Sequence, residues 1–245
     1  MNELMYWNNE AVFITLTYDD EHLPSDYGLH KDDLQKFFKR LRKDLDTKIK
    51  YYACGEYGDR FGRPHFHAII FGLPYSQHGR QLIKDNWLFC DSQRFDYDSR
   101  SHKERGFAPV SPDDIRYVCG YVQKKYNGEK AKEVYGDRLP PFSVCSRGLG
   151  LQFAKDNRDR IADGKITFRG HPVSIPRYYL KKLEIKTNSS FGFQHKVEYL
   201  EKYGYDIKDI PISKVNRFVN EKYQELAESH LNQADRELRK KYEME

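Results

Sequence analysis

The stretch that decides the fold is Pro64-His65-Phe66-His67-Ala68-Ile69-Ile70-Phe71-Gly72, in which two histidines flank one bulky apolar residue. Aliphatic and aromatic residues follow the histidines, and turn residues bound the run on both sides, which is typical of a buried strand. Successive side chains of a strand point to opposite faces, so His65 and His67 share one face while Phe66 enters the opposite layer. Two imidazoles on one face can share a metal ion.

A third metal ligand is available upstream of this strand. Glu56 lies near the end of the apolar run Tyr51-Tyr52-Ala53-Cys54, and a turn-rich link over residues 58–64 joins the two runs. If the runs are neighbouring antiparallel strands, the Glu56 carboxylate meets both histidines. The sequence therefore predicts a metal site of Glu56, His65 and His67, and the alternative is a pair of histidines that are only packed or hydrogen-bonded.

The composition bounds the class of protein. A chain of 245 residues fits one large domain, or a domain with an accessory lobe. The net charge of +5 is modest but uneven, since the first thirty residues contain no Lys or Arg and residues 145–186 contain ten against four acidic residues. Such a basic stretch is a candidate phosphate-contacting surface, and an ordinary solvated charged face is the alternative.

Several classes of protein are disfavoured. The four cysteines are scattered with no Cys-x-x-Cys spacing, which argues against a structural zinc site and against a disulfide framework. The sequence shows no signal peptide and no apolar run near eighteen residues. We therefore expect a soluble intracellular protein that makes no membrane contact.

Hydrophobic periodicity predicts an alternating order of strands and helices. Strands are expected at 12–18, 48–56 and 65–72, helices at 31–45, 77–87 and 111–126, and loop with some strand at 88–110. This order predicts an α+β fold with an antiparallel sheet and helices on one face. Further on, the sequence indicates a linker at Pro140-Pro141 and Gly148–Gly150, an extended segment at 166–179 and a charged helix from Ser213.

The helix predicted at 111–126 carries the second chemical feature. At 100° per residue, Tyr117, Tyr121 and Lys124 form one stripe, while aliphatic residues gather on the far side. A phenol has a pKa of about 10 and is a weak nucleophile, and a neighbouring ammonium group favours the phenolate. A tyrosine, a cation and a metal together suit phosphoryl transfer through a covalent intermediate. The alternative is an ordinary i,i+4 aromatic pair.

These segments together resemble the HUH endonucleases. Phe13–Tyr18 resembles their motif I, and Pro64–His67 resembles their His-hydrophobe-His motif II, with Glu56 where the third metal ligand is expected. Tyr121–Lys124 matches the Tyr-x-x-Lys of motif III, in the family's order. Cys54–Gly58 and Ile175–Tyr179 look more narrowly like the rolling-circle replication initiators of small single-stranded-DNA phages, the microviruses and especially their gokushovirus branch.

The resemblance implies a five-stranded antiparallel sheet of the RRM-like or ferredoxin-like kind, and Mg²⁺ or Mn²⁺ as the cofactor. It implies an HUH endonuclease core at 1–130 and a basic, partly helical accessory region at 131–245 that can pack on the core as one unit. Tyr121 is the expected nucleophile, helped by Lys124. Tyr117 is the second choice, because Gly120 stands where two-tyrosine relatives often carry Lys.

The implied activity is nicking of the origin strand by tyrosine attack, through a 5′-phosphotyrosine bond, followed by rejoining. The implied partners are single-stranded origin DNA, supercoiled replicative-form DNA and a host helicase and polymerase, in the cytoplasm of a bacterial host, with no small-molecule cofactor. The candidate DNA contacts are Lys125, Arg147, Lys155, Arg177 and Lys181.

Three alternatives remain open from the sequence. A relaxase or a single-tyrosine transposase of the same superfamily would use the same chemistry in a different process. A non-catalytic RRM-like nucleic-acid-binding module would carry aromatic residues on its central strands, where bases stack. A metal-dependent hydrolase would cut without any covalent step.

Overall fold

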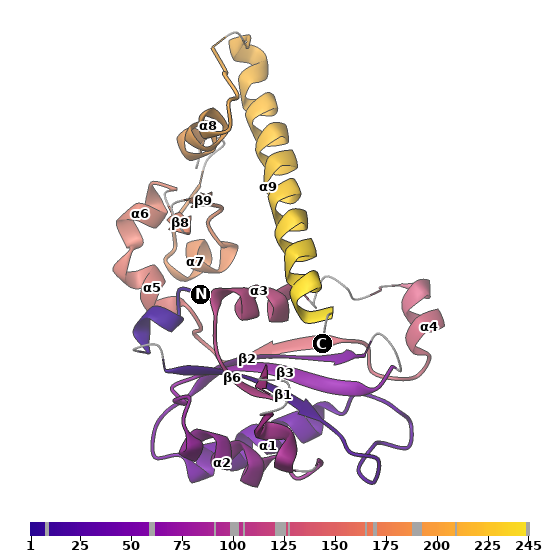
Figure 1. The fold of residues 1–245 in the computed structure, drawn as a ribbon. Helices are drawn as coiled ribbons and strands as arrows, with labels where there is room; N and C mark the ends of the chain where they lie inside the picture. The colour runs from indigo at the N-terminus through magenta and orange to yellow at the C-terminus, as the bar shows by residue number, and fades with distance from the viewer. Residues whose placement is uncertain are drawn as a thin grey trace. The chain divides into compact units, whose positions relative to one another are not determined.

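A computed structural model gives the fold (Figure 1). It describes residues 1–7, 10–58, 62–90, 92–98, 103–104, 106–120, 126, 128–164, 166–168, 171–187, 193–208 and 210–243. The chain divides into two compact units, Met1–Leu149 and Gly150–Glu245, which are described here one at a time. No helix within these described ranges is long and apolar enough to cross a membrane.

The first unit is built on a five-stranded sheet in which every neighbouring pair is antiparallel. Its strands are β1 Ala11–Thr17, β2 Lys50–Tyr57, β3 Pro64–Phe71, β6 Phe107–Pro109 and β7 Phe142–Cys145. Their order across the sheet is β6-β1-β3-β2-β7, so the histidine strand β3 is central. The predicted α+β fold with a central five-stranded antiparallel sheet is confirmed.

Helices pack on both faces of this sheet, with α1 and α2 on one side and α3 on the other (Figure 1). The helices of this unit are α1 Lys31–Asp44, α2 Gln77–Asn86, α3 Pro112–Gly120 and α4 Glu129–Tyr135. Shorter elements are η1 Leu4–Tyr6, η2 Ser92–Phe95, β4 Tyr97–Asp98 and β5 Lys103–Glu104. The expectation of helices on one face only is wrong, because β3 carries apolar side chains on both faces and both must be covered.

The larger core lies between the sheet and helices α1 and α2. It takes alternate residues of β1 and β3, among them Ile14, Leu16 and Phe66, which is the alternation expected of strands. Trp87, directly after α2, is buried in this layer and meets Phe66 edge-on, with ring centroids 5.8 Å apart. Phe66 thus anchors β3 from below while its two neighbouring histidines point to the other face.

The smaller core lies between the other face of the sheet and α3. Ile69 and Phe71 of β3 and Cys54 of β2 pack here against Ile115 and Val118 of α3. These two helix residues belong to the aliphatic face that the sequence predicted to pack. Because this layer covers only one end of β3, the segment with His65 and His67 lies at its margin.

Strand β7 was not predicted, because residues 140–150 read as linker. The strand has four residues of alternating burial, too few to produce a clear periodic signal. Phe142 and Val144 pack against the larger core, and Tyr52 of β2 lies opposite Cys145. The sheet therefore takes its last edge strand from beyond residue 130.

The second unit is mainly helical. Its elements are α5 Leu151–Asp156, α6 Arg158–Ala162, β8 Ile166–Phe168, β9 His171–Val173, α7 Arg177–Lys182, α8 Phe193–Lys202 and α9 Ile212–Glu243. The predicted extended segment at 166–179 is a hairpin only as far as Val173, since Pro176 caps a helix that begins at Arg177. The helix predicted from Ser213 is confirmed as α9.

Replacing Phe66 by Ala is expected to lower the free energy of unfolding by about 3–5 kcal/mol, because it leaves a cavity at a fully buried aromatic site. Urea denaturation of the full chain measures this loss. Leu88→Ala is the control, since Leu88 is exposed and an exposed substitution changes stability by about 0.5 kcal/mol or less. Equal losses in the two variants would contradict the assigned core.

Candidate metal centre

The β2–β3 hairpin brings Glu56 directly opposite His65 in the antiparallel register. Cys54 lies opposite His67, so Glu56 and both histidines share one face of the sheet. The hairpin that the sequence predicted is therefore present, and it places the carboxylate across from the imidazoles. The chain connection through residues 59–61 lies outside the described residues.

The three side chains converge on one point. Glu56 Oε1 lies 2.7 Å from His65 Nε2 and 2.9 Å from His67 Nε2. The ligand atoms of the three residues all lie within 4.8 Å of one another, which makes them a group that can hold a metal ion. Glu56 and His67 are each 6% exposed and His65 is half-buried, so the point is screened from bulk water but reachable from His65.

Hydrogen bonds on the far side of each imidazole orient the rings. His65 Nδ1 lies 3.1 Å from the carbonyl oxygen of Arg63, and a carbonyl can only accept, so Nδ1 carries the proton. His67 Nδ1 lies 3.0 Å from Thr15 Oγ1, which can accept a proton in the same way. When the rings are neutral, these partners leave both Nε2 lone pairs directed at the Glu56 carboxylate.

The donor set fits a divalent cation. Burial alone would raise the pKa of Glu56, but hydrogen bonds from His65 and His67 outweigh it and lower the pKa to about 2. The carboxylate is therefore ionised at neutral pH, and two imidazole nitrogens meet the same oxygen. Three converging acceptors need positive charge between them, which either ring protons or a metal ion supplies. Imidazole and carboxylate together accept Mg²⁺ or Mn²⁺.

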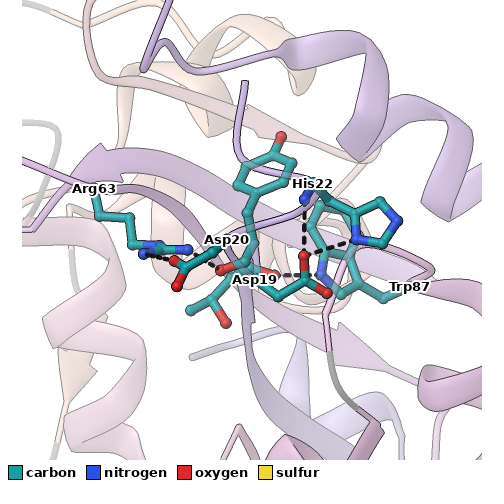
Figure 2. A network of polar contacts seen from close by, with 7 residues as sticks. Asp19, Asp20, His22, Arg63 and Trp87 are labelled. Carbon is teal, nitrogen blue, oxygen red and sulfur yellow. Dashed lines mark hydrogen bonds and ion pairs between the residues drawn. The ribbon is translucent and has the colours of Figure 1, made fainter. Parts of the chain in front are cut away.

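Figure 2 shows the contacts that hold the end of β1 beside this site. The Arg63 guanidinium pairs with Asp20 at 2.7 Å and donates to the carbonyl oxygen of Tyr18 at 3.0 Å, and Trp87 Nε1 donates to the carbonyl oxygen of Thr17 at 2.7 Å. The Asp20 carboxylate is almost fully exposed, so its ion pair contributes about 1 kcal/mol or less. The bond from the buried Trp87 is the firmer anchor.

Helix α3 places a tyrosine against the histidines. Ser111 caps the helix, because its Oγ accepts from the backbone N–H of Asp114 while Asp114 Oδ2 accepts from the N–H of Ser111. The Tyr117 ring meets His67 edge-on, with centroids 5.7 Å apart at 71°. Phe13 of β1 stacks on the same imidazole at 5.5 Å. Tyr117 is therefore on the face of the sheet that carries the trio.

The other predicted site residues are placed as follows. Tyr121, Lys124 and Lys125 lie outside the described residues. Arg147 follows β7 in the first unit and is exposed; Lys155, Arg177 and Lys181 are exposed on the second unit. The roles of all of these residues stay predictions.

Two contributors to the site were missed by sequence reasoning. Thr15 was noted only as a polar residue on an apolar strand, and that polarity was the signal for its bond to His67. Arg63 acts through its backbone carbonyl, which any residue type supplies, so no sequence signal could have identified it.

Glu56→Gln is expected to weaken Mn²⁺ binding by at least the 10–100-fold that the loss of an outer hydrogen-bond partner produces, because it removes the ionised ligand. Isothermal titration calorimetry on the full chain measures this. Glu10→Gln makes the same charge change at an exposed position and should bind as the wild type does. Unchanged affinity in Glu56→Gln would exclude this trio as the metal site.

Thr15→Val is expected to weaken Mn²⁺ binding by about 10–100-fold while preserving side-chain volume, because His67 loses the partner that orients it. Thr17→Val is a matched control on the same strand face, opposite His65, and should keep the wild-type affinity. The same calorimetric titration compares the two. If both variants bind alike, Thr15 does not orient His67.

Comparison with known proteins agrees with this site. Residues 11–126 match the family model described as Replication-associated protein ORF2. Replication-associated protein ORF4 of Chlamydia phage 1 is 32% identical over 204 residues, which is 77% of this chain and 50% of that protein. VP4 of Bdellovibrio phage phiMH2K, also a replication-associated protein, is 33% identical over 189 residues, 73% of this chain and 59% of that protein.

A third relative, Replication-associated protein ORF2 of Spiroplasma virus 4, is 28% identical over 211 residues, 78% of this chain and 63% of that protein. The chain thus spans between half and two thirds of the length of these relatives. No solved structure matches it significantly. The resemblance to phage replication proteins that the motifs indicated is confirmed, and this chain is a relative of the replication-associated proteins of these phages.

Proposed function

We propose that the protein is a metal-dependent, site-specific DNA endonuclease and strand transferase that initiates rolling-circle replication of a phage genome. The observation that carries the proposal is the edge-on contact of Tyr117 with His67, beside the convergence of His65 and Glu56. It puts a phenol next to a candidate metal centre. The relatives' names as replication-associated proteins support a role in replication.

In this proposal Glu56, His65 and His67 hold Mg²⁺ or Mn²⁺. When bound, the metal polarises the scissile phosphate and offsets the negative charge that develops on it. Arg63 and Thr15 keep the two imidazoles in the tautomer that offers Nε2, so these residues preorganise the site. Burial of the trio excludes water that would otherwise compete for the phosphate.

The tyrosine makes the covalent step. Its phenolic oxygen bonds to the phosphorus, the bond from phosphorus to the 3′ oxygen breaks, and that oxygen takes up a proton to become a free 3′-hydroxyl. The phosphate stays on the tyrosine as a 5′-phosphotyrosine, and reversal of the step rejoins strands. We assign the first attack to Tyr121, assisted by the Lys124 ammonium group, and a second attack to Tyr117.

The proposed substrates are single-stranded origin DNA and the supercoiled replicative form, in the cytoplasm of the bacterial host. A host helicase and polymerase would extend the freed 3′-hydroxyl. Exposed cations contact the phosphates without reading sequence, and we assign this role to Lys125, Arg147, Lys155, Arg177 and Lys181.

The proposal predicts a covalent adduct of defined polarity. A single-stranded oligonucleotide carrying the phage origin is incubated with the full chain and Mn²⁺, then run on a denaturing gel. A label at the 3′ end should migrate with the protein, whereas a label at the 5′ end should leave on a short free fragment. Chelation of the metal should abolish both products.

Matched tyrosine variants make this test specific. The double variant Tyr117→Phe, Tyr121→Phe should form no adduct, while Tyr27→Phe, at an exposed tyrosine, should retain it. Cleavage by the double variant would show a hydrolase with no covalent step. A wild-type protein that binds DNA but neither cuts nor joins it in Mn²⁺ would be the non-catalytic module instead.

A further inference from the structure

A groove of about 810 Å³ lies in the first unit where β2 begins, away from the metal centre. It is bordered by the end of α1, the residues that link α1 to β2, the start of β2 and the residues after β7. The lining residues that matter here are Trp7, Arg42, Lys48, Lys50, Tyr51 and Arg147. Its volume falls within the range of ligand-binding sites.

The groove carries uncompensated positive charge. Arg42, Lys48 and Arg147 are exposed, and none of the three has an ion-pair partner among the residues that the structure describes. Lys50 is different, because its ammonium group pairs with Glu3 at 2.7 Å and is neutralised there. Asp46 is the one acidic residue among the described residues that line the groove. The balance favours an anionic ligand.

Two fixed aromatic side chains line the same groove. Trp7 donates from Nε1 to Glu3 at 2.9 Å and packs on Gly72, where an added Cβ would lie only 2.6 Å from the indole ring. Tyr51 stacks on the buried Phe38, with ring centroids 3.7 Å apart. The Arg42 guanidinium lies 5.2 Å from the centroid of Tyr51. Aromatic rings held in place beside cations can stack on exposed bases.

We propose that this groove is a second nucleic-acid site, which binds a segment of single-stranded DNA independently of the metal. The cations would contact phosphates, and the aromatic side chains would contact bases that a duplex keeps stacked inside. Lys50 and Glu56 stand six residues apart on β2, about 20 Å at the rise of a strand, so the groove is separate from the trio. The inference goes beyond the proposed nicking activity and does not need it.

The test uses the full chain, a fluorescein-labelled oligothymidylate of twenty nucleotides, and fluorescence anisotropy in the presence of a chelator. The double variant Lys48→Ala, Arg147→Ala removes two phosphate contacts. On single strands each contact contributes about 0.7 to the slope of log affinity against log salt, so the slope should fall by about 1.4 and the affinity at 0.1 M salt by about 25-fold. The control, Lys36→Ala with Lys39→Ala, makes the same charge change on α1 outside the groove and should bind nearly as the wild type does.

Two results would overturn the inference. One is an equal loss of affinity in the groove variant and in the control, which would mean that only overall charge matters. The other is equally strong competition by a duplex of the same length, which would mean that bases are not engaged. Because the chelator removes metal-dependent chemistry, the Tyr117→Phe, Tyr121→Phe variant should bind as the wild type does, so the outcome is separate from that of the adduct assay.

Discussion

The antiparallel pairing of β2 with β3, in the register that sets Glu56 opposite His65, is the constraint on which the site depends. Because side chains alternate across a strand, a slip of one residue would turn His65 and His67 toward the larger core and bring Phe66 to the site face. Phe66 prevents this slip, since it is fully buried among aromatic rings beneath the sheet. The packing of one face therefore fixes the chemistry of the other.

The trio itself adds little to stability. Removing a carboxylate and two imidazoles from water costs free energy, and the mutual attraction of the charges roughly offsets that cost. The surrounding structure supplies what the trio does not: Thr15 and the carbonyl of Arg63 orient the rings, and Phe13 and Tyr117 cover His67. Such an arrangement is expected where function, and not folding, selects the residues.

Much of this could be predicted from particular residues. The spacing of His65 and His67 on an apolar strand, with Glu56 across a turn, was sufficient for the hairpin and its shared face. Strand β7 was not predictable because its pairing depends on a distant edge of β2. The role of Arg63 was hidden because a backbone carbonyl has no sequence signature, and the position of α3 depended on β3 being apolar on both faces.

The most direct test of the account is the anomalous diffraction of Mn²⁺ in crystals of the full chain. The account predicts a peak bound by His65 Nε2, His67 Nε2 and the Glu56 carboxylate, with the Tyr117 ring still against His67. A crystal whose Mn²⁺ lies elsewhere, while the two histidines and the carboxylate remain joined only by hydrogen bonds, would contradict it.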